Sequence, residues 1–296
     1  MREKILYILC KSLAILPFWA LYALADVVFL VLYYIVRYRR RVVDENLAGC
    51  FPDMDAATRR NVAKRFYRNF ADYIFETVKL LHISDAEMSR RLVFEDLDII
   101  DDFARRGRSM VVYFSHCFNW EWAPSITLHS HPEGVKTAFC QVYRPLKNSA
   151  FDALMLRIRS RFGSISIPKA TVLRHLLTLR RDGLVTVTGF MSDQKPSHGD
   201  PTLPLLFLGR PTAFITGTEE LARRMGMAVV YWDMYKTSRG HYKVVTRTIA
   251  DSAADTEHGF VTRQYAHLLQ NTIERNPSIW LWTHKRWKIP VQLPTE

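Results

Sequence analysis

Short apolar runs recur along the chain and alternate with segments of helical periodicity. The runs at 110–114, 136–143, 184–190, 227–234 and 242–249 are rich in valine and aromatic residues. The run 110–114 is an unbroken apolar row, which is typical of a strand covered on both faces. Helical patterns fill the intervals at 146–162, 169–181, 216–226 and 260–275. This alternation predicts an α/β fold with a mixed central sheet flanked by helices.

The segment 56–81 has the longest helical pattern outside the N-terminal region. Its apolar positions recur at helical spacing: Val62, Phe66, Phe70, Ile74, Val78 and Leu81. Basic residues occupy other positions around the predicted helix: Arg59, Arg60, Lys64, Arg65 and Arg68. The pattern predicts an amphipathic helix with a basic face, which suits solvent, anionic lipid or an acidic protein.

The N-terminal stretch 13–36 is apolar apart from Asp26 and predicts a membrane anchor. At about 1.5 Å per residue, a helix of this length reaches across a bilayer. A cleavable signal peptide is disfavoured because the apolar stretch is long and arginines follow it at 37–41. Pro17 and Asp26 weaken a simple spanning helix, so a helix in the interface and a buried hairpin remain alternatives. The arginines favour a cytoplasmic globular part.

We therefore divide the chain into residues 1–41, an N-terminal membrane anchor with a basic flank, and residues 42–296, a catalytic domain. The first candidate for catalysis is His116, because it follows the apolar run 110–114 directly. Ligands of open α/β sheets bind at the carboxyl ends of strands. Ser115 would cap a following helix, on which Glu121 would lie close enough to orient the imidazole.

A histidine with a carboxylate on one ring nitrogen can take a proton from an alcohol. The alternative for His116 is a hydrogen-bonded histidine of the core. His82 and Glu87 have the same spacing, but they follow an amphipathic helix and are interpreted as a coincidental match.

Two further candidates also stand at predicted strand ends. Arg144 follows the run 136–143 and could contact an anion or an oxyanion, with a structural ion pair as the alternative. Asp193 follows the run 184–190, so the same topology places it near His116. The segment 195–204 is rich in proline, glycine and polar residues and predicts a loop over the site.

Composition narrows the function further. The formal net charge of +12 suits an acidic partner or an anionic membrane, and no nucleic-acid-binding motif is present. The four cysteines have no C-x-x-C spacing, which favours a reduced compartment. His129 and His131 lack partner ligands for a metal, and no phosphate-binding glycine loop or G-x-S-x-G elbow occurs. The pattern therefore disfavours a serine hydrolase and implies neither metal nor cofactor.

Several of these features together resemble the lipid A biosynthesis acyltransferase family, within the lysophospholipid acyltransferase superfamily. The resemblance runs from the anchor to Trp287. It rests on the H-x4-E pattern and on four later segments: Tyr143-Arg144-Pro145, Asp193-Gln194, Phe207-Leu208-Gly209 and Trp280-Leu281-Trp282-Thr283-His284-Lys285-Arg286. The three tryptophans and three cations of the segment 280–288 suit a lipid interface.

The resemblance implies acyl transfer from an acyl carrier protein thioester to a hydroxyl of a lipid A precursor. His116 would be the general base, Glu121 would orient it, and Arg144 and Asp193 would bind substrate. The enzyme would lie at the bacterial inner membrane with its catalytic domain on the cytoplasmic side. Two alternatives stay open: an acyltransferase acting on a glycerophospholipid or another lipid-linked acceptor, and a non-catalytic lipid-binding protein of the same fold.

Overall fold

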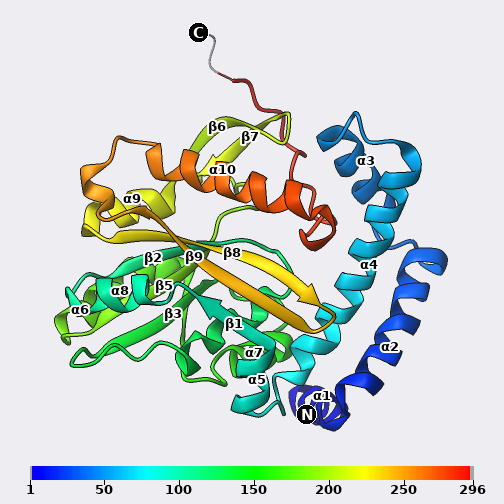
Figure 1. The fold of residues 1–296 in the computed structure, drawn as a ribbon, viewed down its shortest axis with the longest axis horizontal. Helices are drawn as coiled ribbons and strands as arrows, with labels where there is room; N and C mark the ends of the chain where they lie inside the picture. Colours follow the sequence, from blue (N-terminus) through cyan, green and yellow to red (C-terminus); the bar gives the residue numbers. More distant parts are fainter. Residues whose placement is uncertain (1, 294–296) are drawn as a thin grey trace.

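The computed structural model describes residues 2–293, whose centre is a seven-stranded mixed sheet (Figure 1). In sheet order the strands are β1 (Leu92–Glu95), β9 (His241–Ala250), β8 (Ala228–Ser238), β2 (Met110–Phe114), β5 (Val185–Met191), β3 (Thr137–Tyr143) and β4 (Ile165–Pro168). The run from β8 to β4 is parallel, whereas β8 pairs with β9 antiparallel. This confirms the α/β class, and every residue of the central strand β2 is buried, as its unbroken apolar sequence indicated.

Helices cover both faces of this sheet. The covering helices are α5 (Asp85–Arg91), α6 (Asp98–Arg105), α7 (Ser149–Arg159), α8 (Val172–Arg181), α9 (Gly217–Met225) and α10 (Phe260–Arg275). Figure 1 shows α9 and α10 on one side of the sheet and α5 and α7 on the other.

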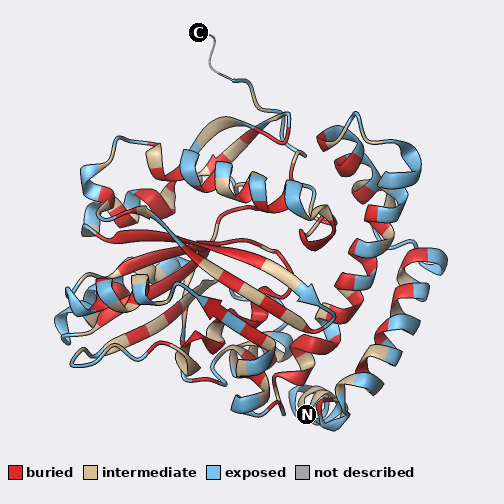
Figure 2. Ribbon diagram, viewed as in Figure 1, coloured by how far each residue is buried: buried red, intermediate tan, exposed pale blue. Residues whose placement is uncertain are grey.

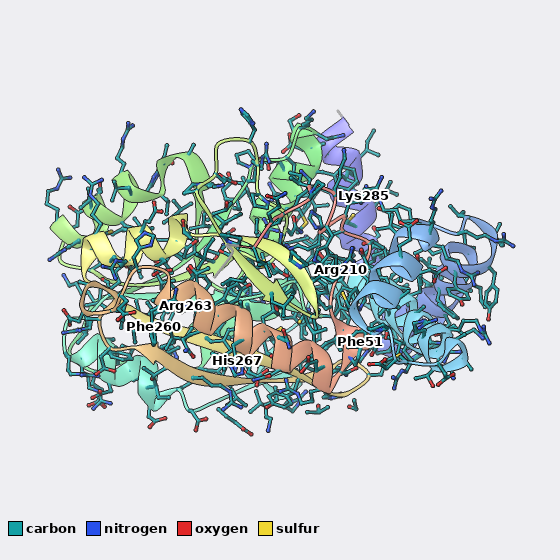
Figure 3. The ribbon with its side chains drawn as sticks, turned by 90° about the horizontal axis from the view of Figure 1, so that it is seen from above. Phe51, Arg210, Phe260, Arg263, His267 and Lys285 are labelled. Carbon is teal, nitrogen blue, oxygen red and sulfur yellow. The ribbon has the colours of Figure 1, made fainter. Side chains whose placement is uncertain are left out.

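A separate antiparallel hairpin, β6 (Thr202–Phe207) and β7 (Arg210–Ile215), packs against α10. Seen from above, Arg210, the first residue of β7, lies between the α3 end of the molecule and the C-terminal segment (Figure 3). The Arg210 guanidinium stacks 4.4 Å from the ring centroid of Trp287. The hairpin thereby joins the C-terminal segment to the rest of the domain.

The long helix α4 (Ala56–Lys79) runs along one end of the sheet and confirms the amphipathic helix predicted for 56–81. Asp55 begins it by accepting hydrogen bonds from the backbone N–H groups of Ala57 and Thr58. Its buried face is only partly apolar, because Asn69, Asp72, Glu76 and Lys79 are also buried. Each has polar partners in distant parts of the chain: Ser278, Arg239, Tyr242 and the backbone of residues 14 and 16, respectively. Periodicity alone could not reveal these partners.

The N-terminal apolar stretch forms two helices, α1 (Arg2–Ile15) and α2 (Phe18–Leu30), separated at Pro17. A π-helical turn at Val31–Ile35 and helix α3 (Arg40–Cys50) follow. Proline interrupts the helical hydrogen bonds, so α1 begins earlier and ends sooner than one continuous helix over 13–36 would. The segment Phe18–Ile35 is long and apolar enough to cross a membrane by length and composition.

One face of α2 packs along α4, and the opposite face is exposed (Figure 2). The Tyr22 hydroxyl donates to Glu76 at 3.1 Å, and Asp26 accepts a 2.8 Å hydrogen bond from Arg239. The N-terminal helices are therefore joined to the globular domain by polar contacts as well as by apolar packing.

Candidate active site

The site is built where two neighbouring parallel strands end. The register pairs Phe114 of β2 with Met191 of β5, so the residues two positions later, His116 and Asp193, stand at the same level. The backbone N–H of His116 donates to Asp193 Oδ2 at 2.9 Å, and His116 Nδ1 lies 2.7 Å from Asp193 Oδ1. The structure thus brings together two residues that the sequence placed at strand ends.

Asp193 is a fully buried carboxylate with three donors around it. Besides the two groups of His116, the Trp280 indole donates to Asp193 Oδ2 at 2.8 Å. Burial acts to raise the pKa of Asp193, but the His116 charge and these hydrogen bonds outweigh it and lower the pKa to about 2. The carboxylate is therefore ionised and can stabilise a positive charge on the imidazole.

The residue expected to orient His116, Glu121, faces another partner. Residues 115–119 form no helix, and Asn119 rather than Ser115 caps the following 3₁₀ helix, Trp120–Leu128. Glu121 is consequently turned away, and its two carboxylate oxygens accept hydrogen bonds of 2.7 and 2.8 Å from Arg159 of α7. In the structure, the carboxylate that contacts the His116 ring is Asp193 and not Glu121, the residue that the sequence analysis expected there.

The second ring nitrogen of His116 faces Gln194. Because Nδ1 faces the carboxylate, the proton of the neutral imidazole lies there and leaves Nε2 as an acceptor. The side-chain amide nitrogen of Gln194 lies 3.1 Å from this Nε2 and donates to it. In this tautomer His116 Nε2 could accept a proton, as a general base must.

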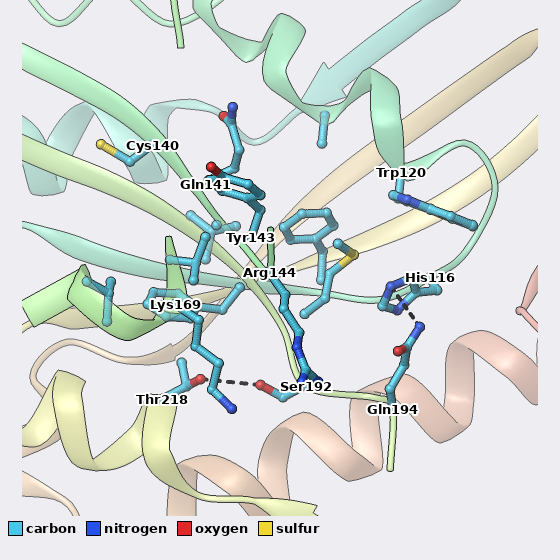
Figure 4. Close-up of a pocket in the computed structure, with 18 of the residues that line it drawn as sticks. His116, Trp120, Cys140, Gln141, Tyr143, Arg144, Lys169, Ser192, Gln194 and Thr218 are labelled. Carbon is cyan, nitrogen blue, oxygen red and sulfur yellow. Dashed lines mark hydrogen bonds between the residues drawn. The ribbon is translucent and has the colours of Figure 1, made fainter. Parts of the chain in front are cut away.

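A pocket of about 610 Å³ is lined by His116, by residues of the sheet and by the 3₁₀ helix (Figure 4). Most of its wall is apolar and comes from Val112, Phe114, Ala123, Ile126, Phe139, Val187, Phe190, Met191, Leu221 and Trp232. The Glu121–Arg159 ion pair also borders it. Its size falls within the range of small-molecule sites, and its wall suits a long apolar ligand.

Two cations stand at the polar end of this pocket. Figure 4 shows Arg144 and Lys169 extending in the same direction, and both contact the loop that follows β5. Arg144 donates to the Ser197 hydroxyl at 3.4 Å, and Lys169 pairs with Asp200 at 2.8 Å. The position of Arg144 at a strand end agrees with the sequence prediction, while Lys169 was not among the predicted site residues.

The coincidental match, His82 and Glu87, makes no contact of this kind. Glu87 forms ion pairs with Arg90 and, at 2.6 Å, with Arg91, and neither His82 nor Glu87 lines the pocket.

The C-terminal tryptophans correct one interpretation. Trp280 and Trp282 are buried inside the domain, so the segment 280–288 does not present its three tryptophans to a lipid interface. Trp280 instead reaches the buried carboxylate at the centre of the site. The sequence held no periodic signal for this contact, because the segment lies in irregular structure.

A histidine that contacts a buried carboxylate at the end of a largely apolar pocket is an arrangement that an acyltransferase could use. Comparison with known proteins agrees. The model of the bacterial lipid A biosynthesis acyltransferase family matches residues 4–289, and the chain belongs to this family.

The individual relatives have low sequence identity to this chain, but the matches cover most of its length. The chain is 22% identical over 252 residues to the lipid A biosynthesis palmitoleoyltransferase of Escherichia coli (strain K12), covering 84% of this chain and 79% of the relative. The lipid A biosynthesis acyltransferase of Shigella flexneri gives the same values. The lipid A biosynthesis lauroyltransferase of Escherichia coli (strain K12) is 21% identical over 251 residues, with the same coverage.

Proposed function

We propose that this protein transfers a fatty acyl group from an acyl carrier protein thioester to a hydroxyl of a lipid A precursor. The observation that carries the proposal is the His116–Asp193 pair at the end of an apolar pocket, in a chain of the lipid A acyltransferase family. Relatives named as a palmitoleoyltransferase and a lauroyltransferase support a fatty acyl group as the transferred unit.

In the proposed reaction His116 Nε2 takes the proton of the acceptor hydroxyl as its oxygen attacks the thioester carbonyl. The resulting imidazolium is stabilised by Asp193, whose carboxylate stays ionised. Collapse of the tetrahedral intermediate breaks the carbon–sulfur bond, and the proton returns from His116 to the leaving thiolate. The ester and the free thiol are the products, so atoms and charge balance without a covalent enzyme intermediate.

Gln194 marks the place of the acceptor in this proposal. Its amide lies 3.1 Å from His116 Nε2, the atom that the hydroxyl must reach. Binding of the acceptor displaces this amide, which then remains near the reacting carbonyl as a hydrogen-bond donor.

In this proposal Glu121 stabilises the wall of the pocket and does not orient His116. Its bidentate pair with Arg159 fixes the wall between the 3₁₀ helix and α7. The apolar residues beyond this wall hold the acyl chain.

In this proposal the cations at the polar end of the pocket attract the acyl donor. Arg144, Lys169 and Lys195 all line the pocket near the loop after β5. An acidic carrier protein and its phosphate-linked arm would be attracted by this cluster.

The exposed apolar faces of α1 and α2 support a position on the bacterial inner membrane, where the lipid acceptor resides. The arginines at 37–41 support a cytoplasmic catalytic domain.

Acyl transfer to a lipid A precursor, followed by mass spectrometry, tests the proposal. His116→Ala should lower kcat by roughly two to four orders of magnitude, the usual contribution of a general base. Asp193→Asn keeps the shape but removes the charge, and it should impair kcat by a comparable factor. His82→Ala is the matched control and should leave the rate unchanged. A folded His116→Ala protein of normal activity would refute the assignment.

A further inference from the structure

A second cavity lies beside the middle of α4, between α2, α4, the tip of the β8–β9 hairpin and the segment after α10. Figure 1 shows α2, α4 and this hairpin side by side. The volume of the cavity is about 730 Å³. The lining residues are Asp26, Phe29, Leu30, Arg65, Arg68, Asn69, Asp72, Lys236, Ser238, Arg239, Asn276 and Ser278. We refer to it as the α2–α4 cavity. None of these residues lines the acyl pocket.

Positive charge exceeds negative charge in the α2–α4 cavity. Both carboxylates are already paired, since Arg239 contacts Asp26 at 2.8 Å and Asp72 at 2.7 Å. Lys236 shares Asp72 at 3.4 Å. The two remaining cations, Arg65 and Arg68, have no carboxylate partner among residues 2–293. The cavity therefore has two guanidinium groups that an anion could neutralise.

These two arginines are placed to act on one ligand. They stand three residues apart on α4, so they share one face of the helix. Like charges at this spacing repel each other by a few tenths of a kcal/mol, and a bound anion relieves the repulsion. The Arg68 guanidinium also lies 4.9 Å from the ring centroid of Phe29, which restricts its side chain. Two guanidinium groups fit the oxygens of a phosphate, which each can bind through two N–H groups.

The residues around the α2–α4 cavity indicate that the phosphate belongs to a lipid. Phe29 and Leu30 of α2 form part of its wall, and Leu30 is 50% exposed. The adjacent Val27 is 57% exposed on the same helix. An exposed apolar helix face enters the acyl region of a bilayer, and the headgroup phosphates lie just outside that region. A cationic cavity beside such a face meets phosphate at the depth where lipid headgroups lie.

We propose that the α2–α4 cavity is a second binding site, in which Arg65 and Arg68 hold the phosphate of a lipid headgroup. The site is independent of acyl transfer if the phosphate belongs to a bilayer phospholipid. It deepens the proposed function, and rests on it, if the phosphate belongs to the acceptor lipid.

The test is vesicle binding of the full-length protein. Phosphatidylcholine vesicles containing phosphatidic acid are compared with vesicles brought to the same surface charge by oleate, which has a carboxylate but no phosphate. Arg65→Gln with Arg68→Gln should weaken binding to the phosphatidic acid vesicles about 30-fold, because the variant loses two charge-assisted contacts with the phosphate. Binding to oleate vesicles should weaken much less.

Two matched variants separate a site from a general attraction of charges. Arg65→Lys with Arg68→Lys keeps both charges but loses the paired N–H groups, so binding should fall about tenfold. Arg41→Gln with Arg60→Gln removes two exposed arginines that do not line the cavity, so it should weaken binding to the two kinds of vesicle equally, through the loss of surface charge alone. Thermal unfolding of each variant verifies its fold.

The outcomes are distinct. Selective loss of binding to phosphatidic acid vesicles assigns the site to a bilayer phospholipid. Unchanged vesicle binding with an approximately tenfold higher KM for a phosphorylated acceptor, absent from the Arg41 and Arg60 variant, assigns it to the acceptor. No difference between the two glutamine variants in either measurement overturns the proposal, as does wild-type behaviour of the lysine variant in both. His116→Ala should bind vesicles normally, so a failure of the proposed reaction would not be mistaken for a failure of this site.

Discussion

The indole Nε1 of Trp280 donates a 2.8 Å hydrogen bond to Oδ2 of Asp193, the carboxylate that contacts the His116 ring. The segment around Trp280 is itself anchored to the β2 end, because the Phe118 N–H donates to the Ile279 carbonyl at 3.0 Å. The C-terminal segment thus forms one side of the site through these two contacts. We assign Trp280 as a positioning residue, which acts on the reaction through Asp193.

Trp280→Phe should lower kcat about tenfold with little change in KM, because one hydrogen bond to a charged group is lost. The pKa of Asp193 should rise, since the lost bond favours the ionised form. Steady-state kinetics of acyl transfer measure the first effect. Trp287→Phe is the control, because its indole donates to Thr212 at 2.8 Å instead, and it should keep a normal kcat. Equal effects of the two substitutions would contradict the positioning role.

Arg159→Gln should lower the free energy of unfolding by about 3 kcal/mol, because it leaves the buried Glu121 carboxylate without its ion-pair partner. Glu121→Gln should cost less, since the Arg159 side chain is 19% exposed and can reach water. Urea denaturation measures both values. The two variants should also change acyl transfer in parallel, because they break the same pair. If Glu121→Gln abolished turnover while Arg159→Gln remained active, Glu121 would have a role of its own in the chemistry.

Low pH should destabilise the fold through His284. Burial lowers the pKa of His284 to about 4, and its Nδ1 has no hydrogen-bond partner. An unfolded histidine has a pKa of about 6.5, so protonation favours the unfolded state. The contribution of neutral His284 is complete above pH 6.5 and is lost as the pH falls from about 6.5 to about 4.

The thermal unfolding of His284→Asn should therefore decline less between pH 7 and pH 4 than that of the wild type. His198→Asn, a substitution in an exposed loop, should decline like the wild type. An identical decline for all three proteins would exclude His284 as a source of acid sensitivity.

Most helices and strands could be predicted from the sequence because each has a recognisable pattern of apolar residues. Apolar runs located β2, β3, β5, β8 and β9, and helical spacing located α4 and α10. The strand order could not be obtained in this way, since it depends on pairings between distant segments. The buried polar face of α4 was also hidden, because Asp72 and Glu76 pair with residues more than a hundred positions away.

The site was predictable as far as it depends on topology. His116 and Asp193 both follow apolar strands, and adjacent parallel strands bring their ends together. The partner of His116 was misassigned because helical geometry was assumed directly after Ser115, whereas residues 115–119 are irregular. Arg159 and Trp280 carried no positional signal, since each reaches the site from another part of the chain.

The ion pair between Asp26 and Arg239 spans 213 positions of the chain, and this separation has a consequence for biosynthesis. At about 5–20 residues per second, a ribosome makes Arg239 roughly 10 to 40 s after Asp26. Over that interval α2 has left the ribosome, but the hairpin that will hold it does not yet exist. The contact between α2 and the tip of the hairpin therefore forms late, when the last third of translation supplies β8 and β9.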